Sequence, residues 1–271
     1  MHKNIILSLI FVFVSLIAPM ILAKDNLTSV YTTHPQVAHT LNFIVSDIVP
    51  PPFIAKPIFK SMSNVHDFGP TTKDLKSLKN KGPLLAGPLT HQKWVLNAKE
   101  LNLLPSQHHL LRFKSSTNEH FWLDVKMGCE FEKVVLNILD SWQIKVSKKK
   151  DYCLWLQERS KQTQSIFYNK GIKKIIITHS ALYEYFKNMG LQVLVLRNDD
   201  HQKEITPQKL KEAYRWKQDK SSVLVIHEKG FSLPPQLQNV GFQKIKWSPL
   251  EDKPRPLMHL QREIEKLKGN L

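Results

Sequence analysis

Two periods alternate in the pattern of apolar and polar positions along the chain. Short runs rich in β-branched residues, typical of strands, are separated by stretches in which apolar residues recur every three or four positions, as on one face of a helix. In residues 35–48, for example, Val37, Leu41 and Ile44 fall on one side. The regular alternation of the two periods indicates βαβ units, in which a helix connects neighbouring parallel strands.

The pattern predicts the following elements. Strands are expected at residues 28–33, 53–62, 84–86, 108–113, 172–178, 192–196, 222–226 and 242–247. Helices are expected at residues 35–48, 71–82, 92–101, within 123–170, and at 181–189, 206–218, 234–238 and 257–268. Thr71 and Asp74 have the spacing of a capped helix start, and the basic stretch at 145–150 is expected to form a turn between two helices.

These elements divide the chain into two α/β lobes with mostly parallel sheets. We expect an N-terminal lobe at residues 24–124, a connecting helical segment at 125–170 and a C-terminal lobe at 171–271. The isoleucine-rich run at residues 172–178 is of the kind that fills a parallel sheet buried on both faces. The predicted fold class is therefore α/β, with a long helical segment joining the two lobes.

The first residues have the layout of an export signal. Lys3 precedes a mostly apolar run at residues 5–18, and Ala23 offers a small residue for cleavage. The apolar run is short for a membrane span. We therefore expect residues 1–23 to be a signal peptide and the mature protein to be exported. A retained N-terminal anchor is the alternative, because Ile21 is bulky for a position three places before the cut.

The charge of the chain bears on its partners. With 42% hydrophobic and 23% charged residues the chain is globular rather than disordered, yet its formal net charge is +16 at pH 7. Such an excess suits nucleic acid or an anionic membrane surface. However, the longest basic run is Lys148-Lys149-Lys150, and the sequence has no arginine-rich stripe interleaved with aromatic residues. We therefore expect no nucleic-acid partner.

Two cysteines are present, Cys129 and Cys153, and both have partly apolar neighbours. In an oxidising compartment they could form one disulfide bond. Two buried thiols are an equally good interpretation, because free cysteine is among the most buried residue types. The sequence leaves both alternatives open.

Three histidines lie where a predicted strand or extended segment gives way to a loop or helix: His66, His120 and His179. In open α/β sheets ligands bind at the carboxyl ends of strands, where loops from different strands converge. Neutral imidazoles gathered there would suit Zn²⁺, Cu²⁺, Ni²⁺ or Fe²⁺, and three of them leave one position of a tetrahedron open. Spacing alone does not distinguish them from surface or capping histidines. One such residue is His34, which we expect at the start of a helix.

Five stretches of the chain occur in the order of motifs known from one family. Residues 66–75, His-Asp-Phe-Gly-Pro-Thr-Thr-Lys-Asp-Leu, resemble the His-Asp-Tyr-x-Pro-x-Pro-x-Asp-Leu segment of the periplasmic metal-binding receptors of ABC transporters for zinc and manganese. Residues 119–124, Glu-His-Phe-Trp-Leu-Asp, resemble that family's Asp-Pro-His-x-Trp-Leu-Asp. Residues 178–193 are similar to its His-x-Ala-x-x-Tyr-Phe…Gly-Leu-x-Val run. Residues 204–210 and 225–228 resemble its Glu-Pro-Ser-Pro-x-x-Leu segment and a strand that ends in glutamate.

The resemblance covers nearly the whole mature chain and implies a function in metal uptake. His66, His120 and His179 occupy the places of the family's metal ligands. It implies a monomeric periplasmic receptor without enzymatic activity, which captures a divalent ion in the cleft between its lobes and delivers it to an ABC permease in the inner membrane. Three imidazoles favour Zn²⁺ over Mn²⁺, which prefers carboxylates. Because metal-binding imidazoles must be neutral, we expect the affinity to fall below about pH 6.5.

The sequence departs from the family at the fourth metal ligand. An acidic residue is usual in a turn near the C-terminus, where this chain has Ser248. Serine is a poor zinc ligand, so water or a carboxylate from Glu251 or Asp252 would complete the site. Glu228, at the end of a strand, would either orient a ligand histidine or cap the next turn.

Other functions fit parts of the same pattern. The departure at Ser248 keeps open a non-transport adhesin or a metal chaperone of the same fold. Three histidines with an open position also describe catalytic zinc. A zinc hydrolase would need a general base such as Asp67 or Glu119, and the sequence has no His-Glu-x-x-His motif.

Overall fold

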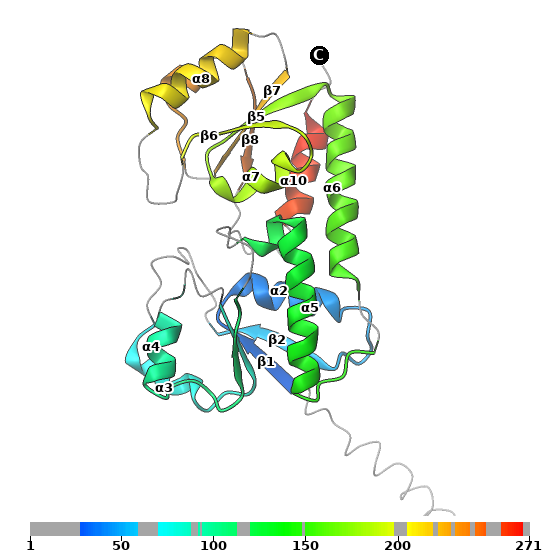
Figure 1. Cartoon of the computed structure of the whole chain (residues 1–271), viewed down its shortest axis with the longest axis vertical. Coiled ribbons are helices and arrows are strands. Elements are labelled where there is room, and N and C mark those ends of the chain that lie inside the picture. Colours follow the sequence, from blue (N-terminus) through cyan, green and yellow to red (C-terminus); the bar gives the residue numbers. More distant parts are fainter. Residues whose placement is uncertain are drawn as a thin grey trace, which may run out of the picture.

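Two four-stranded sheets, each parallel throughout, form the centres of two lobes in the computed structural model (Figure 1). The structure describes residues 28–58, 70–87, 92, 94–112, 120–147, 150–197, 205–218, 222–228, 231–238, 242–247 and 256–267. The α/β class with two parallel-sheet lobes, predicted from the alternating pattern, is confirmed. The expected signal peptide at residues 1–23 lies outside the described residues.

The N-terminal sheet has the strand order β2-β1-β3-β4. Its strands are β1 (Thr28–Thr32), β2 (Phe53–Pro57), β3 (Leu84–Ala86) and β4 (His108–Leu110). The helices of this lobe are α2 (Pro35–Ile44), α3 (Thr72–Leu78) and α4 (Trp94–Glu100). The first strand therefore lies inside the sheet, where its neighbours cover both of its edges.

The C-terminal sheet repeats this topology with the order β6-β5-β7-β8. Its strands are β5 (Ile172–Ile177), β6 (Gln192–Val195), β7 (Ser222–Glu228) and β8 (Gln243–Trp247). They are accompanied by the 3₁₀ turn η2 (Ser180–Leu182) and by α7 (Tyr183–Lys187), α8 (Pro207–Gln218), α9 (Pro235–Gln238) and α10 (Pro256–Lys266). The last three residues of β5, Ile175, Ile176 and Ile177, are all buried, although successive side chains of a strand point to opposite faces, as expected for a strand covered on both faces.

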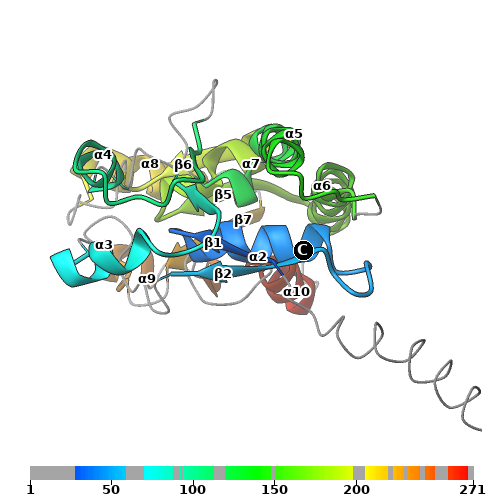
Figure 2. The ribbon, with the colours of Figure 1, turned by 90° about the horizontal axis from the view of Figure 1, so that it is seen from below.

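Two long helices connect the lobes. The 3₁₀ turn η1 (Phe121–Leu123) leads into α5 (Val125–Ser141), which lies along the N-terminal lobe, and α6 (Tyr152–Asn169) follows beside the C-terminal lobe (Figure 1). Both views place α5 and α6 side by side, and the two helices are in contact (Figure 2). One hydrophobic core runs through both lobes and these helices, and includes Val30, Phe131, Leu156 and Leu224. The lobes are therefore parts of one packed body.

Local chemistry explains where several helices begin and end. Thr71 and Asp74 form the predicted capping box of α3, in which each side chain accepts the other residue's backbone N–H. His34 caps α2 as expected, with Nδ1 accepting the N–H of Gln36. Helix α2 is shorter than the predicted 35–48, because the carbonyl of Ile44 accepts the N–H of Lys150. The carbonyl group of Ile44 thus receives its hydrogen bond from a distant segment, whereas in a longer helix the next turn would have supplied the N–H donor.

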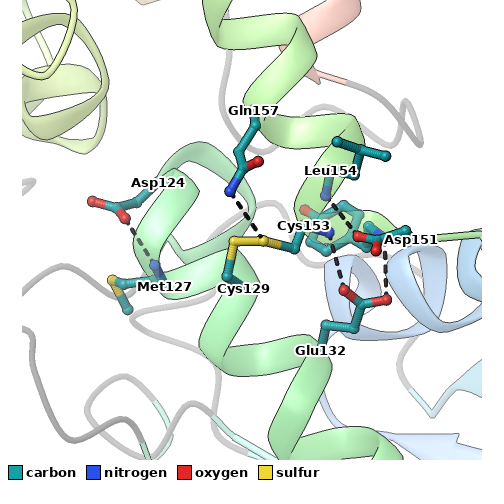
Figure 3. Close-up of a disulfide and its surroundings, with 9 residues drawn as sticks. Asp124, Met127, Cys129, Glu132, Asp151, Cys153, Leu154 and Gln157 are labelled. Atoms are coloured by element: carbon teal, nitrogen blue, oxygen red, sulfur yellow. Dashed lines mark hydrogen bonds between the residues drawn. A yellow bond between two sulfur atoms is a disulfide. The ribbon is translucent and has the colours of Figure 1, made fainter.

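The two cysteines form a disulfide bond between α5 and α6, with Cα atoms 4.4 Å apart (Figure 3). Of the two alternatives that the sequence left open, the structure therefore has the disulfide. Across the described residues, no helix combines the length and apolar character that crossing a membrane requires.

Candidate metal centre

Two of the three predicted ligand histidines meet at the junction of the lobes. His120 stands directly before η1, and His179 is the second residue after β5. Their ring centroids are 5.2 Å apart, with the ring planes nearly perpendicular. Each residue is only 6% exposed. The third, His66, lies outside the described residues, as do Ser248, Glu251 and Asp252.

Hydrogen bonds hold His179 at the carboxyl end of the C-terminal sheet. Its Nδ1 accepts the backbone N–H of Ala181 at 3.0 Å, so the ring caps η2. The preceding residue, Thr178, accepts the N–H of Glu228 on its Oγ1 at 2.9 Å. Strands β5 and β7 and the turn after β5 thus fix the position of this imidazole.

The cap bond of His179 has a consequence for metal binding. A neutral imidazole has one proton and one acceptor nitrogen, and Nδ1 is the acceptor here, so the proton lies on Nε2. A metal on Nδ1 would take the place of the Ala181 N–H, and a metal on Nε2 would require the proton to move to Nδ1. Ligation by the neutral ring therefore exchanges this hydrogen bond, worth about 1 kcal/mol, for the bond to the metal.

An arginine ties three strand ends together beside His179. Arg197 Nε donates to the carbonyl oxygen of Thr178 at 3.1 Å, and its Nη2 donates to Glu228 Oε2 at 2.9 Å. The guanidinium group lies 4.5 Å from the ring centre of Phe231. The Oε2 atom of Glu228 thus pairs with Arg197, a partner that neither interpretation of this residue had named. Neither the motifs nor the hydrophobic pattern indicated a role for Arg197.

The ring of Trp122 lies beside His120. The centroid of the Trp122 ring is 5.2 Å from that of His120 and 4.9 Å from that of His34. Trp122 is 4% exposed, and its indole N–H has no hydrogen-bond acceptor within the described part of the chain. The segment 120–122 therefore contacts a histidine from each lobe, His34 of the N-terminal lobe and His179 of the C-terminal lobe.

The turns that present His34 and His179 are equivalent in the two lobes. Each histidine follows a threonine after the first strand of its sheet, and each Nδ1 accepts the N–H of the residue two places on. Thr33 Oγ1 accepts the N–H of Gly87 after β3, just as Thr178 Oγ1 accepts that of Glu228 at the end of β7. The sequence carries a signal of this repeat, a Thr-His pair after each of two strands, but the pair is too short to be noticed alone.

The described residues bring together two side chains of a type that binds metal ions. Among them, no group of three or more histidine, cysteine, aspartate or glutamate side chains is close enough to hold a metal ion. They do bring together two imidazoles that come from different parts of the chain and are shielded from water. Such a pair can serve as two nitrogen ligands for a borderline-soft divalent ion.

Solved structures of metal-binding proteins share this architecture. Two parallel-sheet α/β lobes of this kind are the fold of the receptors that the motifs resemble, so the fold agrees with that resemblance. Comparison with protein-family models gives no match, and comparison with curated protein sequences gives none either.

Particular solved structures share the fold at low sequence identity. A deletion mutant of ZnuA with zinc bound has a TM-score of 0.67 and 15% identity, over 91% of this chain and 100% of that chain. AdcAII of Streptococcus pneumoniae has a TM-score of 0.67 and 19% identity, over 90% and 98%. Lmb of Streptococcus agalactiae, described as a laminin-binding protein with adhesin and metal-transporting activity, has a TM-score of 0.64 and 16% identity, over 89% and 98%. At these identities the likeness establishes the fold.

Proposed function

We propose that this protein is a periplasmic receptor that captures zinc and delivers it to an ABC permease. The observation that carries the proposal is the meeting of His120 and His179, buried and 5.2 Å apart, at the junction of the lobes. The fold is shared with a ZnuA structure that contains bound zinc. His66, placed by its motif, is the third proposed ligand.

The chemistry of the proposed ligands favours zinc. Three neutral imidazoles suit Zn²⁺ better than Mn²⁺, which prefers oxygen ligands. Glu251 or Asp252, or else water, would fill the fourth position, because Ser248 is a poor zinc ligand. The protein would hold the ion without turnover, so we assign it no catalytic residue.

The same proposal covers location and partners. Removal of residues 1–23 would release a soluble receptor into the periplasm, where a disulfide such as Cys129–Cys153 is stable. The receptor would act as a monomer and dock on a permease in the inner membrane.

A second candidate is a non-transport adhesin or metal chaperone of the same fold. It is favoured by the likeness to Lmb, whose description combines adhesin and metal-transporting activity. A permease and an ATPase encoded beside this protein would favour transport, whereas binding of laminin to the purified protein would favour the adhesin.

The decisive experiment measures metal content and zinc affinity. The chain from residue 24 is compared with a triple variant, His66→Ala, His120→Ala and His179→Ala. We expect one tightly bound zinc in the first and none in the second. Single variants His109→Ala and His259→Ala, which remove histidines from β4 and α10, serve as controls and should bind zinc normally. A wild-type chain that is folded but binds no zinc would overturn the proposal.

A further inference from the structure

The Cys129–Cys153 bond joins α5 to α6, the two helices that lie between His120 and His179 in the sequence (Figure 3). Cys129 is in the second turn of α5, just after His120 and η1, and Cys153 is in the first turn of α6, which leads to β5 and His179. We propose that this disulfide is a positioning element of the metal site and sets how long the metal stays bound. The inference rests on the proposed zinc-binding function and adds a determinant outside the ligand set.

On the α5 side, the segment of His120 is fastened to the turns that contain Cys129. Asp124 caps α5 by accepting the N–H of Met127 at 2.9 Å. The ring of Phe121 stacks on that of Phe131, with centroids 4.1 Å apart and planes 14° from parallel. A displacement of the start of α5 would therefore move η1 and His120 with it.

Gly128 shows how tightly this region is packed. A Cβ atom on Gly128 would lie 2.1 Å from Leu156 Cδ1 of α6 and 3.2 Å from the carbonyl oxygen of Phe121. The two helices and η1 thus touch at one point, directly beside Cys129. A larger residue at this position would have to displace the end of the Leu156 side chain.

On the α6 side, the segment after His179 is fastened to the middle of the helix. Tyr185 of α7 donates its hydroxyl hydrogen to Thr163 Oγ1 of α6 at 3.1 Å, and both residues are buried. Gln164 Nε2 donates to the carbonyl oxygen of Met189 at 3.0 Å. Because η2, capped by His179, runs directly into α7, a movement of α6 would be passed to His179.

The disulfide is part of a series of contacts that leads from His120 to His179, called the path below. The sequence of contacts is His120 and η1, α5, the Cys129–Cys153 bond, α6, Tyr185 and α7, and finally His179. The packing contacts and hydrogen bonds that link separate elements of the path can break and re-form on fast timescales. The disulfide adds a covalent restraint between α5 and α6 to these weaker contacts. Loss of it should increase the range of distances between the two imidazoles.

Zinc binding to the full chain with and without the bond tests this inference. We expect Cys129→Ser/Cys153→Ser to bind zinc about tenfold more weakly, the scale found when groups that orient metal ligands are removed. The loss should lie in a faster dissociation rate, measured by transfer of zinc to a chromophoric chelator.

Two further variants separate positioning from general destabilisation. Leu237→Ala removes a buried side chain from the hydrophobic cluster on the other face of the C-terminal sheet and leaves the path intact, so its zinc dissociation rate should match that of the wild type. Tyr185→Phe removes only the hydroxyl that bonds Thr163, and it should speed dissociation severalfold even if the cysteine variant fails to fold.

The outcomes distinguish the two proposals. Folded wild-type protein that binds no zinc refutes the proposed function. Tight zinc binding by the wild type, with dissociation rates within twofold for the cysteine variant and Tyr185→Phe, refutes the positioning role and leaves the proposed function standing. A rate increased equally by Leu237→Ala also refutes it, because stability would then be the cause.

Discussion

The buried carboxylate of Glu132 gives the sharpest prediction about stability. This residue of α5 is 4% exposed, and its two oxygens accept the backbone N–H groups of Tyr152 and Cys153 at 3.1 and 3.0 Å (Figure 3). It therefore caps the N-terminus of a neighbouring helix, where unpaired N–H groups and the helix dipole both favour a negative charge.

The expected magnitude follows from these two bonds. Hydrogen bonds to a charged acceptor contribute about 1.5–3 kcal/mol each, and burial of the carboxylate offsets part of this. We expect Glu132→Ala to lower the free energy of unfolding by about 3 kcal/mol, since it strands two N–H groups. Glu132→Gln should cost about half as much, because the amide keeps one acceptor oxygen and turns its NH₂ group towards a donor.

Urea unfolding of the oxidised protein, followed by circular dichroism, measures the effect. A loss of about 3 kcal/mol corresponds to a midpoint lowered by about 1 M. Glu158→Gln, the same chemical change at an exposed position of α6, is the matched control and should stay within about 0.5 kcal/mol of the wild type. If Glu132→Ala shifted the midpoint no more than this control, the capping role assigned to Glu132 would be wrong.

Three further outcomes are expected. The disulfide closes a loop between cysteines 24 residues apart in the sequence. Its loss in Cys129→Ser/Cys153→Ser should lower the free energy of unfolding by about 3.5 kcal/mol on the chain-entropy model. A decrease of less than about 1 kcal/mol in urea unfolding would contradict that model. Gly128→Ala should destabilise by about 1–2 kcal/mol in the same assay, since the clash with Leu156 outweighs the better helix propensity of alanine; a more stable variant would show that Leu156 moves aside freely. Burial lowers the pKa of His227, with a smaller contribution from Lys246. As the pH falls below about 6.5, this histidine is therefore protonated more readily in the unfolded chain than in the folded one, and the folded state loses stability. His227→Gln should therefore lose less stability than the wild type between pH 7 and pH 5 in thermal melts, and parallel pH profiles would count against this.

Much of the secondary structure could be predicted from the sequence because its causes are local. The alternation of strand and helix periods located the elements, and the spacing of Thr71 and Asp74 located a helix start that has the predicted capping box. Boundaries were less well predicted where a distant segment decides them. Helix α2 ends at Ile44, four residues before the predicted end, where the N–H of Lys150 reaches its carbonyl.

The candidate site could be predicted only in part. Motif resemblance selected His120 and His179, and their convergence in the structure is in keeping with that selection. The role of Glu228 was left between two alternatives, because its partner Arg197 lies at the end of another strand and no spacing rule connects them. The third histidine, His66, and the proposed boundaries of the lobes stay predictions.

By itself, the sequence determined the class of the fold: hydrophobic period, β-branching and capping residues act over a few positions, and each is written in consecutive residues. Only the tertiary structure decided which distant groups meet. It joined Cys129 to Cys153, set Glu132 on the N-terminus of α6 and brought His120 within 5.2 Å of His179. Such pairings depend on how strands order themselves in a sheet and how helices pack, and these follow from the burial of one common core rather than from any local pattern.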